Sequence, residues 1–100
     1  MVSSYPACFI KEEDGYTVIF PDLGNVATCG SDLEEAEYMA VDCLAGYLMW
    51  LEEDGEEVPE PSVEEAVQVS ELLHWLELDD AEAFVKMISV DAKEYAKEHF

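Results

Sequence analysis

The sequence predicts an α+β domain in which a long amphipathic helix packs on one face of an antiparallel sheet. Three observations support this fold class: an Asp-Gly pair between two apolar runs, a helical pattern of apolar residues over 33–51, and a run of β-forming residues over 84–90. With 50% hydrophobic residues, a chain of 100 residues can bury one modest core but not two. We therefore expect a single domain over residues 1–100.

The first expected element is a β-hairpin. Residues 5–10 form a short apolar run, and Asp14-Gly15 marks the turn that follows, because Gly accepts a positive φ without steric cost. Residues 16–20 then alternate between the two faces of a second strand. Pro21 ends that strand, and residues 26–29 are expected to form a third short strand.

A long helix is expected between Gly30 and Gly55. Ser31 and Glu34 have the spacing of a capping box, and Gly55 provides a stop at the C-terminal end. Apolar residues recur at the three-and-four spacing of one helical face: Leu33, Ala36, Ala40, Cys43, Leu44, Tyr47 and Leu51. This stripe predicts that the helix packs on the sheet.

The apolar surface of this helix is wider than one buried stripe requires. The additional apolar residues lie on its flanks or on its opposite side: Tyr38, Met39, Val41, Leu48, Met49 and Trp50. Two interpretations are open, because either a neighbouring segment covers this surface or copies of the chain meet there. The second interpretation predicts a homodimer or a higher homo-oligomer that associates through Tyr38, Met39, Met49 and Trp50.

The second half of the chain is expected to return to the sheet. The prolines in residues 56–62 favour an extended connector. Residues 63–78 resume helical spacing, which predicts an extra helical segment before the last strand. Residues 84–90 are expected to form a fourth strand, and residues 91–100 a short closing helix.

The composition is strongly acidic, with 25 Asp and Glu residues against four basic residues and a net charge of −21. This balance argues against binding of nucleic acid, which requires clustered Lys and Arg, and against binding to anionic membranes. A basic protein partner is the natural complement. The other interpretation is that the acidity serves only solubility or reflects an acidic proteome.

Four acidic residues at the end of the long helix are the predicted partner contacts. Glu52, Glu53 and Asp54 occupy its last turn, where the helix dipole favours cations, and Glu56 follows just beyond. Negative charge is unfavourable at the C-terminal end of a helix, and residues that are locally unfavourable can mark a functional surface. A solvated cluster without a partner is the alternative.

No catalytic, cofactor or metal site is predicted. His74 and His99 have no nucleophile or metal ligand at a suitable spacing, and the Gly residues form no phosphate-binding pattern. Asp14 and Asp22 flank one strand and could chelate a divalent cation, but turn formation explains both residues.

The cysteines and the termini indicate a cytoplasmic protein. Cys8, Cys29 and Cys43 lie in apolar patterns and are expected to be buried free thiols. Residues 1–5 have neither the basic start nor the apolar run of a signal peptide. The longest apolar stretch, residues 43–51, is too short to span a membrane.

Four short blocks of the sequence occur in a characteristic order and cover more than half of the chain. They are Tyr5-Pro6…Glu13-Asp14-Gly15-Tyr16…Phe20-Pro21-Asp22-Leu23, Gly30-Ser31-Asp32-Leu33-Glu34-Glu35-Ala36, Leu51-Glu52-Glu53-Asp54-Gly55-Glu56 and Pro59-Glu60-Pro61-Ser62. This ordered set resembles the HicB-type antitoxins. Residues 84–100 also resemble the final strand and short helix of that domain.

The resemblance implies a β-β-β-α-β core similar to a degenerate ribonuclease-H fold without its catalytic carboxylates. It implies the antitoxin of a type II toxin–antitoxin pair rather than an enzyme. The family's toxin is a small basic ribonuclease that cleaves mRNA, and the antitoxin inhibits the toxin by covering its active site. No cofactor is implied.

Many members of this family continue into a C-terminal domain that binds DNA. This chain ends at Phe100, where such a domain would begin, so the expectation is a single antitoxin domain over residues 1–100 that does not bind nucleic acid by itself. Two departures from the family pattern are visible. Gly24-Asn25 replaces a usual Pro-Gly pair, and residues 63–83 are longer and more helical than the usual connector.

Two other functions remain open. An acidic mimic of nucleic acid that inhibits a different basic nuclease would fit the charge equally well. A metal-dependent hydrolase of the ribonuclease-H type would require three or four convergent carboxylates that hold Mg²⁺.

Overall fold

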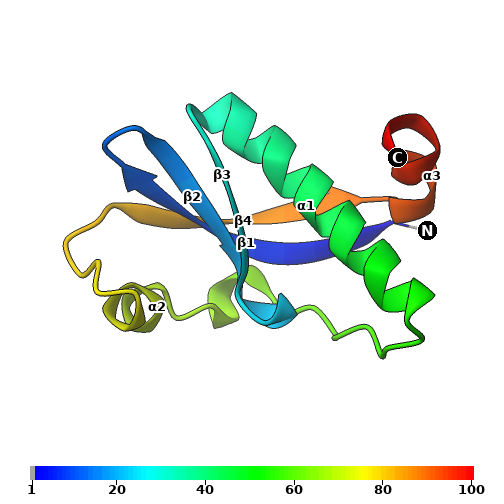
Figure 1. Ribbon diagram of the computed structural model, residues 1–100. Helices are drawn as coiled ribbons and strands as arrows, with labels where there is room; N and C mark the ends of the chain where they lie inside the picture. The colour runs from blue at the N-terminus through cyan, green and yellow to red at the C-terminus, as the bar shows by residue number, and fades with distance from the viewer. Residues whose placement is uncertain (1) are drawn as a thin grey trace.

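The structure is a computed structural model that describes residues 2–100. A four-stranded antiparallel sheet with the order β3-β2-β1-β4 is flanked by helices on both faces (Figure 1). The strands are β1 Ser3–Glu12, β2 Gly15–Phe20, β3 Val26–Gly30 and β4 Ala83–Val90. The helices are α1 Leu33–Glu53, α2 Val69–Trp75 and α3 Ala92–His99, with short 3-10 turns η1 at Pro21–Leu23 and η2 at Glu64–Ala66. The predicted α+β class and its long helix are confirmed.

The sheet forms around the predicted hairpin. Phe9 of β1 pairs with Val18 of β2, and on its other side Phe9 pairs with Phe84 of β4. β1 is therefore a central strand, and β3 and β4 form the two edges. Because β4 returns antiparallel to β1, residues near the two ends of the chain lie side by side, as in the pair Ser3 and Val90.

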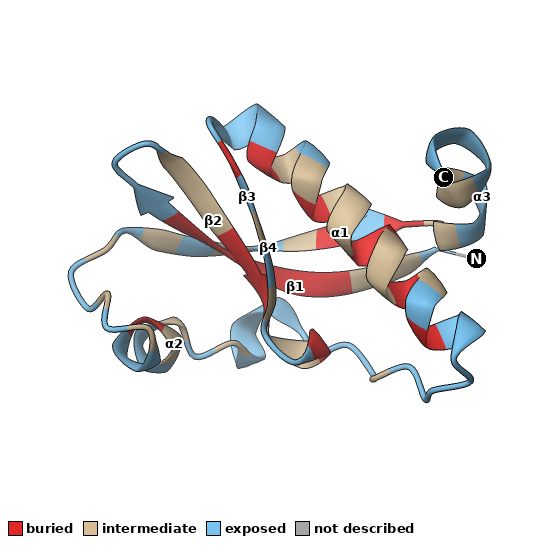
Figure 2. Ribbon diagram, in the orientation of Figure 1, coloured by how far each residue is buried: buried red, intermediate tan, exposed pale blue. Residues whose placement is uncertain are grey.

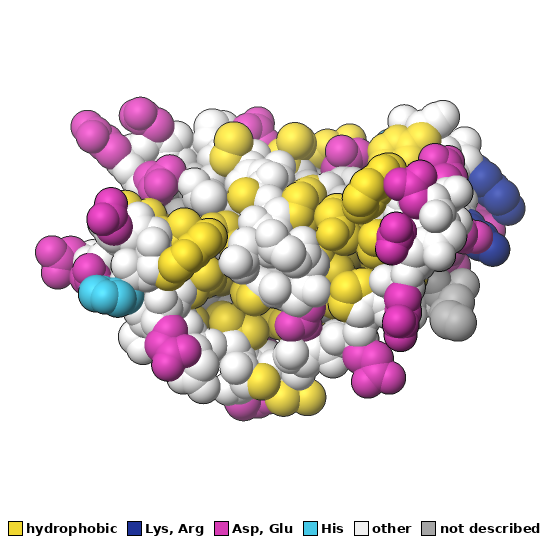
Figure 3. Space-filling model, turned by 60° about the horizontal axis from the view of Figure 1, so that its bottom comes forward, with side chains coloured by type: hydrophobic (Ala, Val, Ile, Leu, Met, Phe, Trp, Pro, Cys, Tyr) yellow, Lys and Arg dark blue, Asp and Glu magenta, His cyan; other side chains and the backbone are white. Residues whose placement is uncertain are grey.

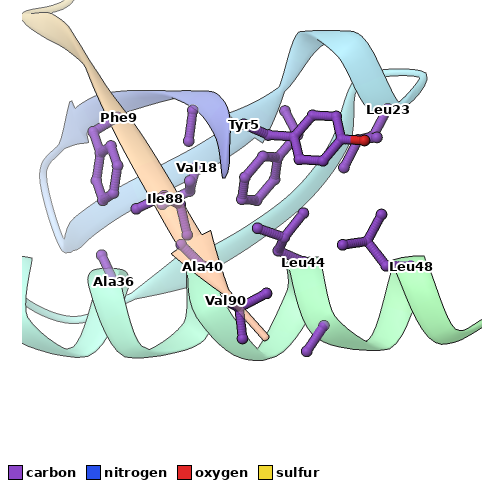
Figure 4. Close-up of a cluster of buried hydrophobic side chains, with 13 residues drawn as sticks. Tyr5, Phe9, Val18, Leu23, Ala36, Ala40, Leu44, Leu48, Ile88 and Val90 are labelled. Carbon is purple, nitrogen blue, oxygen red and sulfur yellow. The ribbon is translucent and has the colours of Figure 1, made fainter. Parts of the chain in front are cut away.

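The main core lies between α1 and one face of the sheet (Figures 2 and 4). Side chains alternate along a strand, so Tyr5, Ala7 and Phe9 of β1 all point towards the helix. Leu44 and Leu48 point from α1 towards Tyr5 (Figure 4). Leu44 has no exposed surface, which confirms the buried stripe at its centre.

The stripe predicted for α1 is wrong at its first position. Leu33 is 39% exposed, because it is the first residue of the helix and lies beyond the part that covers the sheet. The helix cap is formed by Asp32, whose Oδ1 accepts a hydrogen bond from the N–H of Glu35 at 2.8 Å. In return, Glu35 Oε1 accepts from the N–H of Ser31 at 2.9 Å, so the capping pair lies one residue later than the sequence predicted.

The sequence did not predict that the opposite face of the sheet is also covered. Leu73 of α2 is buried there against Cys8 and Ile10 of β1 and Ile19 of β2, and these residues form a second, smaller core. The helical segment predicted over residues 63–78 is therefore present only in part. The segment is divided into η2 and α2, because the backbone is extended at Val67, the C-cap of η2. The second piece, α2, ends before Glu77, which has a positive φ of 62°.

The connector before α2 is fixed to the sheet by hydrogen bonds. Ser62 donates twice to Asp22, from its N–H to Oδ2 at 2.6 Å and from its Oγ to Oδ1 at 2.9 Å. The Tyr5 hydroxyl donates to the carbonyl of Pro59. Burial, together with the charge of Asp22, raises the pKa of Tyr5 above its ordinary value. Asp22 therefore has a structural role as an anchor for the connector.

The closing helix α3 packs on α1. Its Tyr95 hydroxyl donates to Asp42 Oδ1 at 2.9 Å, and the Tyr95 ring stacks on His99 with a centroid separation of 4.1 Å. Burial raises the pKa of Tyr95 well above its usual range, and the hydrogen bond to Asp42 raises this pKa further. Part of the surplus apolar surface of α1 is thus covered within the chain. Val41 and Tyr95 both pack against the main core.

Candidate partner-binding surface

The acidic residues at the end of α1 are held in a defined backbone geometry. Gly55 has a φ of 69°, which is the left-handed conformation that L-residues rarely adopt. Its N–H donates to the carbonyl of Glu52 at 3.2 Å, and the N–H of Glu56 donates to the carbonyl of Leu51 at 2.9 Å. This pair of bonds is a Schellman motif. The motif turns the chain sharply, so that Glu56 emerges beside the last turn of the helix.

The four predicted contacts, Glu52, Glu53, Asp54 and Glu56, are all exposed at this end of the molecule. Lys93 of α3 lies beside them, with its Nζ 3.5 Å from Glu52 Oε1. Within residues 2–100, no other salt bridge joins a basic side chain to this group. The C-terminal end of the helix dipole adds further negative potential. The structure therefore brings the four residues together as an exposed acidic end of α1.

The four residues predicted for self-association are only partly brought together. Tyr38 and Trp50 are 56% and 51% exposed, whereas Met39 and Met49 are half-buried. Helical spacing places Met39, Cys43 and Trp50 on one flank of α1, where Cys43 is half-buried against the main core. Helical spacing places Tyr38 and Met49 on a different side of α1, together with Asp42, which accepts a hydrogen bond from Tyr95 of α3. The apolar surface available for contact is thus a narrow stripe that ends at Trp50.

The two histidines occupy exposed positions. His74 Nδ1 lies 3.0 Å from Asp79 Oδ1, and the His74 side chain is 83% exposed. His99 stacks on Tyr95. Among residues 2–100, no group of three or more His, Cys, Asp and Glu side chains has the arrangement of a metal site. None of the helices within residues 2–100 has the length and hydrophobicity that a membrane span requires.

The prediction of three buried thiols is correct for Cys8, correct in part for Cys43 and wrong for Cys29. Cys8 is buried in the second core, and burial raises the pKa of its thiol. Cys43 is half-buried, and its thiol pKa is raised by burial and by the charge of Asp42. Cys29 is exposed because it lies on the edge strand β3, on the face where α2 covers only β1 and β2.

Sequence reasoning missed a groove on the side of the sheet that carries α2. Its walls are η1 with Asp22 and the segment from Ser62 to Trp75, and its volume is about 340 Å³. On this face, Asp and Glu side chains lie around the rim, and apolar side chains gather towards the middle (Figure 3). One sequence signal was present: Trp75 falls outside the apolar spacing of Val69, Leu72, Leu73 and Leu76, and so faces solvent.

Residues 4–73 match the family model of the HicB-like antitoxins of bacterial toxin–antitoxin systems. The chain belongs to this family. Membership of a family of antitoxins confirms that it is not an enzyme. The chain is also similar to two antitoxins of Photorhabdus laumondii. It is 41% identical to antitoxin HicB 2 over 58% of this chain and 42% of that protein. It is 44% identical to antitoxin HicB 1 over 50% of this chain and 32% of that protein.

The chain is also similar to chains in solved structures of toxin–antitoxin complexes. A chain in a toxin–antitoxin complex from Streptococcus pneumoniae superposes with a TM-score of 0.82 at 29% identity, over 95% of this chain and 73% of that one. A chain in the HicA3–HicB3 toxin–antitoxin complex superposes with a TM-score of 0.66 at 18% identity, over 83% and 94% of the two chains. At 18% identity, this second similarity shows only that the two chains share a fold. The chain spans less than half the length of the curated relatives it matches.

Proposed function

We propose that this chain is a cytoplasmic antitoxin that binds a small basic mRNA-cleaving ribonuclease and neutralises it by covering its active site. The observation that carries the proposal is the match of residues 4–73 to the HicB-like antitoxins. The similar structure from Streptococcus pneumoniae is that of a toxin–antitoxin complex, which supports a toxin as the partner. The β-β-β-α-β order of elements supports a core related to a degenerate ribonuclease-H fold.

The acidic end of α1 is the proposed contact with the toxin. An active site that binds RNA must present basic side chains to the phosphates. Glu52, Glu53, Asp54 and Glu56 can meet such side chains with exposed carboxylates, on a backbone that the turn at Gly55 holds in place. Binding of a cationic surface relieves the repulsion among these carboxylates and with the helix dipole. Covering the site in this way excludes the substrate without any chemical step.

An acidic mimic of nucleic acid that inhibits another nuclease is the second candidate function, and the net charge of −21 favours it equally. The two functions differ in selectivity. A dedicated antitoxin inhibits the toxin encoded beside its own gene and leaves unrelated basic ribonucleases active. A general mimic inhibits both classes at similar concentrations.

Growth of bacteria that express both proteins tests the proposed function. The small basic protein encoded next to this gene is expected to arrest growth when it is induced alone. Induction of the present chain together with it is expected to restore growth, and the two proteins are expected to purify as one complex. If growth stays arrested although both proteins accumulate in folded form, the chain is not the antitoxin of that protein.

Self-association through the exposed stripe of α1 is a further part of the proposal. Trp50 buries only part of its ring, against Tyr47 at a centroid separation of 5.6 Å, so a second copy would remove the remaining apolar surface from water. In sedimentation velocity, the chain is expected to form a dimer or larger species at micromolar concentration, and Trp50→Ala is expected to be monomeric. Trp75→Ala, which removes an exposed Trp on the other face, is the matched control. A monomer at every concentration would exclude self-association.

A further inference from the structure

The groove between η1 and α2 combines an apolar wall with two carboxylates. Trp75 is 64% exposed at its rim, and Leu72 is half-buried in its wall. Asp22 lines the groove from η1, and Glu71 lines it from α2. Most of the Trp75 surface is open to solvent at 64% exposure, so its indole offers a flat apolar face to a ligand.

The Asp22 carboxylate is oriented before any ligand arrives. Each of its oxygens accepts one hydrogen bond from Ser62, Oδ2 from the N–H and Oδ1 from the hydroxyl. A carboxylate oxygen has two lone pairs, so both oxygens keep the capacity to accept a second bond. Because this rotamer is already fixed, little side-chain entropy is lost when a cation binds.

No basic side chain of the chain itself supplies that cation. The described residues that line the groove include no Lys, Arg or His. The four Lys residues of the sequence, Lys11, Lys86, Lys93 and Lys97, all lie on other elements. His74 belongs to α2 but does not line the groove, and its Nδ1 lies 3.0 Å from Asp79 Oδ1. A second copy of the chain, at a net charge of −21 and without Arg, would bring mainly further negative charge.

From this arrangement we propose that the groove receives one Lys or Arg side chain of the basic protein partner. Its aliphatic stem lies against Trp75 and Leu72, and its cationic head reaches Asp22 and Glu71. Long basic side chains suit such a site because they carry an apolar stem and a charged end. The indole face attracts a cation, and carboxylates form charge-assisted hydrogen bonds with it. The inference rests on the proposed function, since the partner is the toxin.

Two substitutions in the full chain test this assignment, because both residues are exposed and neither lies in a core. The dissociation constant of the complex with the purified toxin is measured by calorimetry. Trp75→Ala is expected to weaken binding roughly tenfold or more, as truncation of an interface Trp commonly does. Glu71→Gln is expected to weaken it about fivefold, and more at low salt than at high salt. Glu77→Gln, which removes the same charge outside the groove, is expected to change binding by less than about twofold.

Tryptophan fluorescence gives a second readout that does not depend on these variants. Trp50 and Trp75 are the two Trp residues of the chain, so Trp50→Phe leaves emission from Trp75 alone. Addition of a toxin variant without Trp is expected to shift this emission to shorter wavelength.

The possible outcomes distinguish a failure of the groove assignment from a failure of the proposed antitoxin function. If the toxin binds the unmodified chain, and Trp75→Ala and Glu71→Gln bind it equally tightly with no shift in emission, the groove is not a contact and the antitoxin function stands. If Trp75→Ala changes only the sedimentation of the chain, the groove contacts a second copy and the assignment is wrong. If the unmodified chain does not bind the toxin, both the function and the groove assignment fail.

Discussion

Replacing Leu44 by Ala is expected to lower the free energy of unfolding by about 2–5 kcal/mol. Leu44 is fully buried at the centre of the core between α1 and the sheet. The substitution removes apolar contacts and leaves a cavity that the rigid sheet cannot close. Urea denaturation followed by circular dichroism measures the change, with the slope of the transition checked for two-state behaviour.

Leu33→Ala is the matched control for this prediction. Leu33 belongs to the same helical stripe by sequence, but it is 39% exposed. Its replacement is expected to cost less than about 1 kcal/mol, since most of its surface contacts water in the folded state. Equal losses at the two positions would show that α1 does not pack on the sheet as described.

Changing Glu52, Glu53 and Glu56 together to Gln is expected to slow association with the toxin by about tenfold at low salt. Exposed charges at the rim of an interface mainly steer the encounter, so the dissociation rate is expected to change less. The difference from the unmodified chain is expected to shrink as salt rises, because ions screen exposed charges. Stopped-flow fluorescence at several salt concentrations measures both rates.

A second triple variant with the same net charge separates position from total charge. Glu13, Glu77 and Glu82 are exposed and lie away from the end of α1, and their change to Gln is expected to slow association only slightly. If the two triple variants slow association equally, only the total charge of the chain steers the toxin. If neither variant slows it, the toxin binds a different surface.

The elements that the sequence predicted well are those that local signals specify. The hairpin turn and the stop at Gly55 need only a few neighbouring residues, and both occur in the structure. The turn lies one residue earlier than predicted, because Glu13 and Asp14 form the loop and Gly15 begins β2 with a φ of 148°. The long helix follows from a spacing that repeats over many residues. β4 and α3 also form as expected, although their places in the sheet and on α1 depend on distant partners.

The features that the sequence did not predict depend on contacts between distant residues. Ser62 lies at the end of the expected connector, and nothing in the sequence indicates that it donates to Asp22, which lies 40 residues earlier. The sequence predicts Leu73 only as one apolar position in a longer helix, but in the structure its side chain is buried against β1 and β2 and forms part of the second core. Cys29 lies in an apolar pattern, and only the edge position of β3 shows that nothing covers it.

The candidate site could be predicted only as a list of residues. The acidic run around Gly55 is visible in the sequence, and its exposure follows from its charge. The approach of Lys93 to Glu52 could not be predicted, because it depends on how β4 places α3 beside α1. The groove could not be predicted either, since its walls come from η1 and α2, which are far apart in the chain.

Titration of the toxin's ribonuclease activity with this chain tests the proposed antitoxin function most directly. The purified toxin is mixed with increasing amounts of the chain, and the initial rate of mRNA cleavage is measured for each mixture at physiological salt. If the chain covers the active site, the rate is expected to fall in proportion to the added chain and to reach zero at a fixed stoichiometric ratio. Pancreatic-type ribonuclease, which is also basic, is expected to keep its activity at the same ratios. A toxin that cleaves mRNA at an unchanged rate in the presence of excess folded chain would contradict the account.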